Sequence, residues 1–173
     1  MRRYALLLVG FLMSCGTPEQ EQRSAELEYF DLKGYFSKEA ASLSRSAALV
    51  SKTVIVNDSA EQKQVKITNW EKELSAFVDA DINKVAWKGA FKTNSNDAGL
   101  QYTSTNDKVP VKRLQIIKNN EAITGIVIVL ENSNYLYRST DTLSYYPDSL
   151  YQIKKSQQIK LMSPKRYQIT GRF

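Results

Sequence analysis

The sequence predicts an α+β fold: a bent antiparallel β-meander of about seven to nine strands, packed against a long N-terminal helix, with a short second helix. Three observations support this prediction. Residues 24–47 carry apolar side chains at helical spacing. The second half of the chain consists of short runs in which apolar and polar residues alternate. These runs are joined by turns such as "NNE", "NSN", "PDS" and "SP", and such short connections require antiparallel neighbours.

The first helix is expected over residues 24–47, with Ser24 as its N-cap and acidic residues in the first turn, where the helix dipole favours them. Residues 48–56 are rich in β-branched side chains, which predicts a strand. This strand is expected to pair with residues 63–68 across the turn "NDSAEQ". The helix is expected to pack on the concave, inner face of the sheet.

A second, short helix is expected from Trp70 to about Val78, because Thr68 and Glu71 match a capping box. After it, the alternating pattern predicts strands to the end of the chain. Residues 126–130 are apolar on both faces, which predicts a central strand covered on both sides. The expected strands are 85–92, 100–105, 111–118, 122–131, 135–146, 151–162 and 165–173.

The first fifteen residues have the layout of an export signal. Arg2 and Arg3 precede an uncharged apolar run, residues 4–13, which is shorter than the roughly 20 residues that a membrane-spanning helix needs. The run has the length of the apolar region of a signal peptide. It leads to Cys15, the only cysteine in the chain.

The stretch Leu12-Met13-Ser14-Cys15 resembles the lipobox of bacterial lipoproteins, with Met13 as its least typical residue. The resemblance implies transfer of a diacylglyceryl group to the Cys15 thiol and cleavage before Cys15. Because each buried methylene contributes about 0.8 kcal/mol, several acyl chains on one residue hold a protein on a membrane without a spanning segment. We therefore expect a lipid attachment site at Cys15.

Three regions follow from this reading. Residues 1–14 are the expected lipoprotein signal peptide. Residues 15–24 are the expected lipidated cysteine and a flexible tether, because "GTPEQEQRS" is polar and lacks apolar periodicity. Residues 25–173 are expected to form a single α+β domain.

Composition excludes several kinds of chemistry. The chain has no histidine, which removes the commonest general base and every Ser-His-Asp arrangement. One cysteine allows neither an internal disulfide nor a cysteine-rich zinc site. The net charge of +6 is uneven: residues 16–107 carry 11 Lys/Arg and 14 Asp/Glu, whereas residues 108–173 carry 11 and 4. Such asymmetry can steer a protein toward an anionic partner, or it can reflect a sheet face decorated with solvated lysines.

The remaining motifs do not assemble into a catalytic or metal site in the sequence. Residues 79–84, "DADINK", begin like a calcium loop but carry Lys84 where glycine is required and Ala90 where glutamate is required. A histidine-free hydrolase could use paired carboxylates among Glu71, Glu73, Asp79 and Asp81, or a serine with a lysine base, for which "SLSRS" and "KKS" are matches of low specificity. Tyrosines in adjacent strands either line a ligand-binding face or act as half-buried cross-strand partners, namely Tyr135, Tyr137, Tyr145, Tyr146 and Tyr151.

The phrases "YFDLKGYF" and "WEKELSAFVDADINK" resemble those of uncharacterised lipoproteins from Bacteroidota, a resemblance that implies no activity. Together these features predict a non-enzymatic lipoprotein anchored in a Gram-negative cell envelope and binding or supporting another envelope component, protein or glycan. Gly16 after Cys15 points by resemblance to the outer membrane. No cofactor, catalytic residue, metal or nucleic acid is expected. The alternative is a carrier whose pocket between sheet and helix encloses a small hydrophobic ligand or lipid, lined by residues such as Trp87, Tyr102 and Tyr137.

Overall fold

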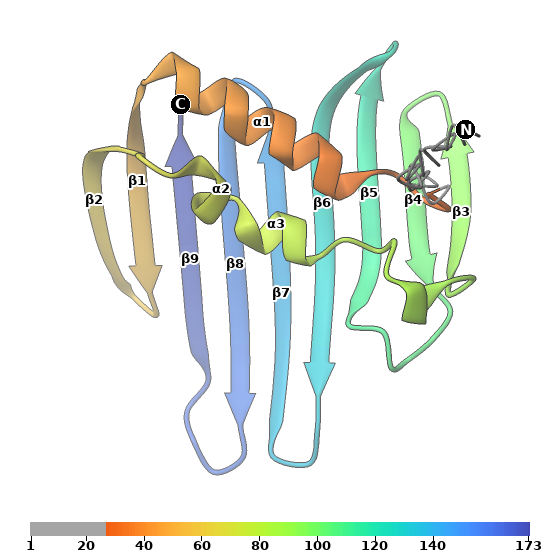
Figure 1. Cartoon of the computed structure of the whole chain (residues 1–173). Coiled ribbons are helices and arrows are strands. Elements are labelled where there is room, and N and C mark those ends of the chain that lie inside the picture. The colour runs from red at the N-terminus through yellow and green to blue at the C-terminus, as the bar shows by residue number, and fades with distance from the viewer. Residues whose placement is uncertain (1–26) are drawn as a thin grey trace, which may run out of the picture.

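The computed structural model describes residues 27–173 as a nine-stranded antiparallel sheet with a few helices on one face (Figure 1). The helical segments are α1 (Leu32–Ser46), α2 (Trp70–Glu73), α3 (Ser75–Asp79) and the 3-10 turn η1 (Val85–Trp87). The strands are β1 (Leu49–Val56), β2 (Ser59–Lys66), β3 (Phe91–Asn96), β4 (Gly99–Ser104), β5 (Val111–Asn119), β6 (Ala122–Ser133), β7 (Tyr137–Tyr146), β8 (Leu150–Ile159) and β9 (Lys165–Arg172). The predicted signal peptide, tether and Cys15 site lie outside the described residues.

The predicted antiparallel sheet is confirmed, but it is not one continuous meander. Strands β3 to β9 follow one another in space as in sequence, and the β1–β2 hairpin then adds to the far side of β9, giving the order β2-β1-β9-β8-β7-β6-β5-β4-β3. Val54 of β1 lies opposite Ile169 of β9. This pairing joins distant parts of the chain, so local turn chemistry does not reveal it.

The first helix is shorter than the predicted 24–47, because α1 begins only at Leu32. Its N-cap is Asp31, whose side chain accepts a hydrogen bond from the Gly34 backbone N–H at 2.8 Å. Residues 27–30 are not helical, because distant side chains take up their backbone groups. The Tyr29 N–H donates to Asn83 Oδ1 at 3.0 Å, and the Phe30 N–H donates to the Tyr102 hydroxyl at 3.2 Å.

The second helix is also interrupted, since α2 and α3 are separated at Leu74. Asn69, rather than the predicted Thr68, caps it by accepting from the Lys72 N–H at 2.8 Å. The strand predicted over 85–92 is wrong in its first half. Residues 85–87 form η1 instead, and β3 begins at Phe91, after Gly89, which has a φ of +70°.

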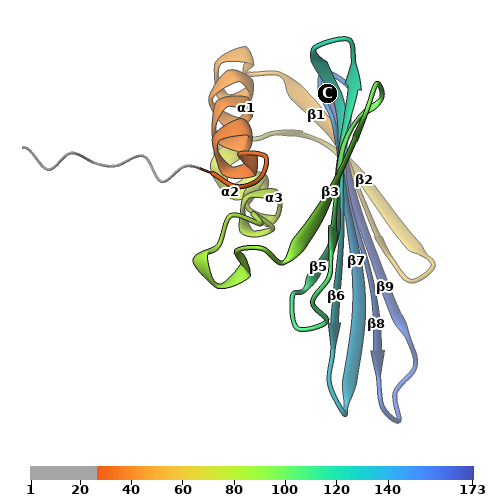
Figure 2. The same cartoon turned by 90° about the vertical axis from the view of Figure 1, so that its right-hand side faces the viewer.

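The helices cover only one face of the sheet (Figure 2). Ile126 and Ile128 of β6 point into this covered face and are buried, whereas Val127 and Val129 point away from it and are only half-buried. The prediction that residues 126–130 are covered on both sides is therefore wrong. The antiparallel sheet leaves its second face to solvent, as such sheets commonly do.

Two neighbouring tyrosines tie the helices to the sheet. Tyr145 of β7 lies opposite Tyr151 of β8, and both side chains are fully buried. The Tyr145 hydroxyl donates to Glu39 of α1 at 2.5 Å, and the Tyr151 hydroxyl donates to Glu73 of α2 at 2.5 Å. Each of these two helices is thus held by a partly buried hydrogen bond to a carboxylate, a bond type stronger than one between neutral groups. Aromatic rings fill the space around the pair, namely Phe36, Phe77, Trp70 and Phe173.

Gly171 of β9 makes room for Tyr151, so we expect Gly171→Ala to destabilise the fold by about 1–3 kcal/mol. A Cβ atom at this position would lie 2.2 Å from Cε1 of Tyr151, whose ring is fixed by burial and by Glu73. Gly125→Ala is the matched control, because its Cβ would meet the half-buried Tyr146 ring at 3.0 Å. Chemical denaturation measures the free energy of unfolding of both variants. Equal losses for the two variants would contradict this account.

Alkaline pH should weaken the fold through the same tyrosines. Burial, and next the hydrogen bond to a glutamate, raises the pKa of both Tyr145 and Tyr151 far above the ordinary value of 10.0. The folded state therefore keeps protons that the unfolded chain releases. This contribution is complete below about pH 10 and declines as pH rises further, by up to about 1.4 kcal/mol per pH unit for each tyrosine.

Denaturation curves at pH 8 to 12 should show this decline in the wild type. The variant Tyr145→Phe/Tyr151→Phe should start from a lower stability and decline less steeply, because it lacks both titrating groups. Tyr135→Phe is the control, since this ring is 84% exposed. The explanation fails if the double variant keeps the wild-type slope.

Candidate functional site

The face of the sheet opposite the helices, here called the open face, is left uncovered by the other described elements (Figure 2). Strand alternation and register assign its residues. On β8, for example, Tyr151 and Ile153 point toward the helices, whereas Gln152 and Lys154 point to the open face. The covered face contains the core, so the open face is free to present polar side chains.

One line of hydrogen-bonding residues crosses the whole open face, with one residue on every strand. We call it the cross-sheet row. Eight of its nine members are Gln, Thr, Ser or Asn, and the exception is Val127. In spatial order the row is Gln62, Thr53, Thr170, Gln152, Ser144, Val127, Gln115, Gln101 and Asn94.

Part of this row is held in place by its own hydrogen bonds. The Thr170 hydroxyl, 6% exposed, accepts from the Gln152 amide at 3.0 Å and from the Gln168 amide at 3.4 Å. These bonds fix the directions of the two amides. The rest of the row presents amide and hydroxyl groups that can both donate and accept hydrogen bonds.

Charge is distributed very unevenly between the two faces. Among the strand residues of the open face, Glu131 is the single acid. The other described acids lie in turns, in the helical layer or on the covered face. The cations on the open face are Lys66, Lys92, Arg113, Arg138, Lys154, Arg166 and Arg172. This face therefore presents a positive surface beside an uncharged row.

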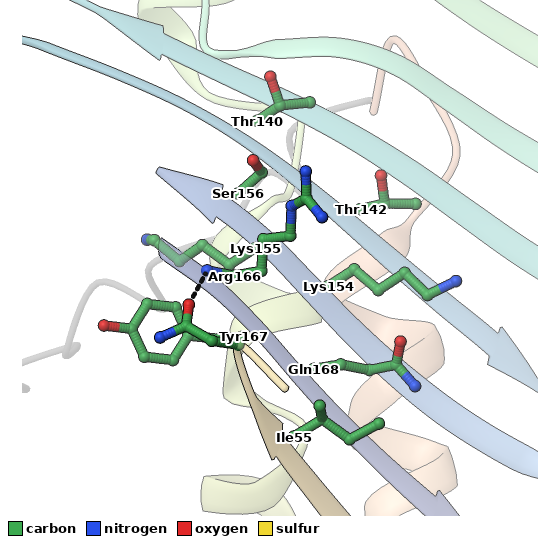
Figure 3. A pocket seen from close by; sticks show the side chains of 10 residues that line it. Ile55, Thr140, Thr142, Lys154, Lys155, Ser156, Arg166, Tyr167 and Gln168 are labelled. Atoms are coloured by element: carbon green, nitrogen blue, oxygen red, sulfur yellow. Dashed lines mark hydrogen bonds between the residues drawn. The ribbon is translucent and has the colours of Figure 1, made fainter. Parts of the chain in front are cut away.

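A hollow of about 350 Å³ lies at the end of this face where β1 stops and β9 continues (Figure 3). Arg166 and Lys154 extend over it, beside the hydroxyls of Thr140, Thr142 and Ser156. We call these residues and their neighbours the basic hollow. Asn57 fixes its edge, since its Oδ1 accepts from the Arg166 backbone N–H at 3.1 Å. The remaining lining residues are Ile55, Lys155, Tyr167 and Gln168.

A second hollow, of about 490 Å³, lies on the covered face between α2 and the sheet. Ile153 and Ile169 line it, and Lys52 and Glu73 form an ion pair at 2.6 Å within it. Glu73 also accepts from Tyr151, so both members of this ion pair already have protein partners. This α2 hollow is the place where a ligand between sheet and helix would have to bind.

The five tyrosines considered as a ligand-binding cluster do not gather. Tyr145 and Tyr151 are cross-strand partners in the core, and Tyr146 points to the open face. Tyr137 lies at the far end of β7, where its hydroxyl accepts from Gln157 at 3.2 Å. Tyr135 is exposed, with the Lys160 ammonium 4.2 Å from its ring centre. The cross-strand pairing is thus confirmed for Tyr145 and Tyr151, but the two side chains are fully buried rather than half-buried.

The acidic residues have structural partners of their own. Glu73 belongs to the Lys52 and Tyr151 contacts, while Glu71 is exposed on α2. In "DADINK", the Asp81 carboxylate accepts from the Asn83 side chain at 3.2 Å. The Asn83 amide in turn donates to the Phe30 carbonyl at 3.0 Å. The segment therefore binds the start of the described chain through hydrogen bonds.

The residues expected to line a carrier pocket also lie apart. Tyr102 is buried and holds the Phe30 backbone, and Tyr137 lies at the far end of β7. Trp87 lies in η1, where the Lys84 ammonium is 4.3 Å from its ring centre. The sequence allows for a sheet face decorated with solvated lysines, but it does not locate the cross-sheet row. A signal for it exists in "STDTLSYY" and "KKSQQIK", where Ser, Thr and Gln recur with few acids, but only the strand register aligns them.

No protein-family model, curated protein or solved structure matches this chain. Within residues 27–173, no helix is both long enough and apolar enough to cross a membrane. In the same range, no three His, Cys, Asp or Glu side chains are grouped so that they could hold a metal ion.

Proposed function

We propose that this protein is a lipid-anchored, non-enzymatic lipoprotein of a Gram-negative cell envelope, most simply of the outer membrane, and that its open face binds another envelope component. The observation that carries the proposal is the cross-sheet row. It places a hydrogen-bonding side chain on eight of nine neighbouring strands, on a face that no other described element covers.

The position of the chain start supports the same arrangement. The described chain begins beside the helical layer, on the opposite side of the sheet from the open face (Figure 2), where Asn83 and Tyr102 bind the backbone of Tyr29 and Phe30. The first described residues therefore leave the open face unobstructed, and a partner elsewhere in the envelope can reach it.

A carrier of a small hydrophobic ligand or lipid is the second candidate, and the α2 hollow favours it. Ile67, Ile153 and Ile169 give this hollow an apolar floor between helix and sheet. Lys72 at its rim could meet a negatively charged head group. The core beneath α1 and α3 is filled by aromatic rings, so a ligand would have to stay at this edge.

The anchor is tested by growing cells that express the wild type or Cys15→Ala with a tagged fatty acid. We expect the wild type to be labelled and to sediment with membranes, whereas Cys15→Ala is neither labelled nor sedimented. Labelling of both proteins, or of neither, would contradict lipid attachment at Cys15.

The binding face is tested by placing a photo-crosslinking residue at one position at a time in the full-length lipoprotein in its native envelope. Gln115 and Ser144 represent the open face, Ser42 on α1 the helical layer, and Thr68 the α2 hollow. We expect one discrete adduct from Gln115 and Ser144 and none from Ser42. Adducts confined to Thr68 would favour the carrier, and adducts confined to Ser42 would contradict both candidates.

A further inference from the structure

We propose that the partner of the open face is a linear anionic glycan that lies across the strands along the cross-sheet row. This inference rests on the proposed function, because it names the chemistry of the component that the same face binds. It uses two properties of the open face that are independent of each other, its repeat and its charge.

The repeat matches a polymer better than a compact ligand. Adjacent strands lie about 4.8 Å apart, so nine strands extend the row over roughly 40 Å. Along that length the described residues offer amide or hydroxyl groups at every strand except two: β6 contributes Val127, and on β9 the Thr170 hydroxyl is buried and already accepts from two amides. A linear glycan carries hydroxyl groups at regular intervals along its whole length. A small molecule would use only a few positions of such a row.

The charge selects an anionic polymer. A second line of residues runs parallel to the row on the open face, two positions away on each strand. Its three charged members are Lys154, Arg113 and Lys92, and all are cations. All three side chains are exposed, and none forms an ion pair within residues 27–173. Arg172 lies on the opposite side of the row. Carboxylate or phosphate groups on a glycan would therefore meet cations on both sides of its path.

Other occupants fit less well. A second copy of this chain would oppose seven cations to seven cations, with Glu131 as the single acid on each open face. A single-stranded nucleic acid stacks its bases on aromatic rings, and Tyr146 is the one aromatic residue among the strand positions of the open face.

The test uses the full-length lipoprotein in mild detergent and measures its affinity for polygalacturonate, a linear polyuronate. The fully methyl-esterified polymer has the same backbone without the charge. Anionic phospholipid vesicles and a single-stranded oligonucleotide are the competing probes. The charge variant is Lys154→Gln/Arg113→Gln. Its matched control is Lys33→Gln/Lys38→Gln, which removes two exposed cations from α1 instead. Gln101→Ala/Gln115→Ala tests the row itself.

We expect polygalacturonate to bind in a salt-sensitive manner and its methyl ester to bind at least about tenfold more weakly. The charge variant should lose about tenfold in affinity and the row variant about fivefold, while the control variant stays within about twofold. Unfolding midpoints of all variants identify any that fail to fold. If the charge variant fails to fold, Arg172→Gln serves as the second charge variant. It should bind polygalacturonate more weakly while keeping the stability of the wild type.

Several results would overturn the inference. These are equal affinity for the charged and esterified polymers, equal loss in the charge and control variants, tighter binding of the oligonucleotide, or binding to vesicles alone. If no polyuronate binds but the Gln115 and Ser144 crosslinks persist in native envelopes, the glycan inference fails and the proposed function stands. If those crosslinks are also absent, both fail.

Discussion

The buried tyrosine pair at the centre of the sheet is the contact on which the rest of the structure depends. Tyr145 and Tyr151 lie side by side on β7 and β8, and each hydroxyl reaches a glutamate on a different helix. A buried tyrosine hydroxyl needs a partner, because an unsatisfied one costs about 1–3 kcal/mol. The two glutamates supply these partners only when α1 and α2 lie on the same face. One cross-strand pair thereby decides on which side of the sheet the helices pack.

This one-sided arrangement determines what the other side can be. All the helical segments lie over one face, so the alternation of β6 buries Ile126 and Ile128 and leaves Val127 and Val129 half-buried. An exposed sheet face usually mixes acidic and basic residues. Here the charged strand residues of this face are cations with the single exception of Glu131, while the other described acids lie in turns, in the helical layer or on the covered face. Burial explains why the covered face is largely apolar. Solvation alone does not explain why the open face has so few acidic residues.

The strands of the meander could be predicted because their signals are local. Alternating side chains and turn residues such as those of "NNE" and "PDS" act over a few positions. The errors occur where distant contacts decide. The first helix starts at Leu32 because Asn83 and Tyr102 take up the backbone at Tyr29 and Phe30. The β1–β9 pairing and the cross-sheet row depend on register across the whole chain, which periodicity in one segment does not contain. The Cys15 anchor stays a prediction, since it lies outside the described residues.

The central claim is that the open face is the binding surface, and the side-chain amide signals of its glutamines test this most directly. Gln152 and Gln157 lie on the same strand, both half-buried, but on opposite faces of the sheet. In a nuclear magnetic resonance titration of the full-length chain with glycans extracted from its own envelope, the Gln152 and Gln115 amide signals should shift or broaden. Gln157 should stay unchanged. A shift of Gln157 and of α1 signals, with Gln152 and Gln115 unmoved, would contradict the account.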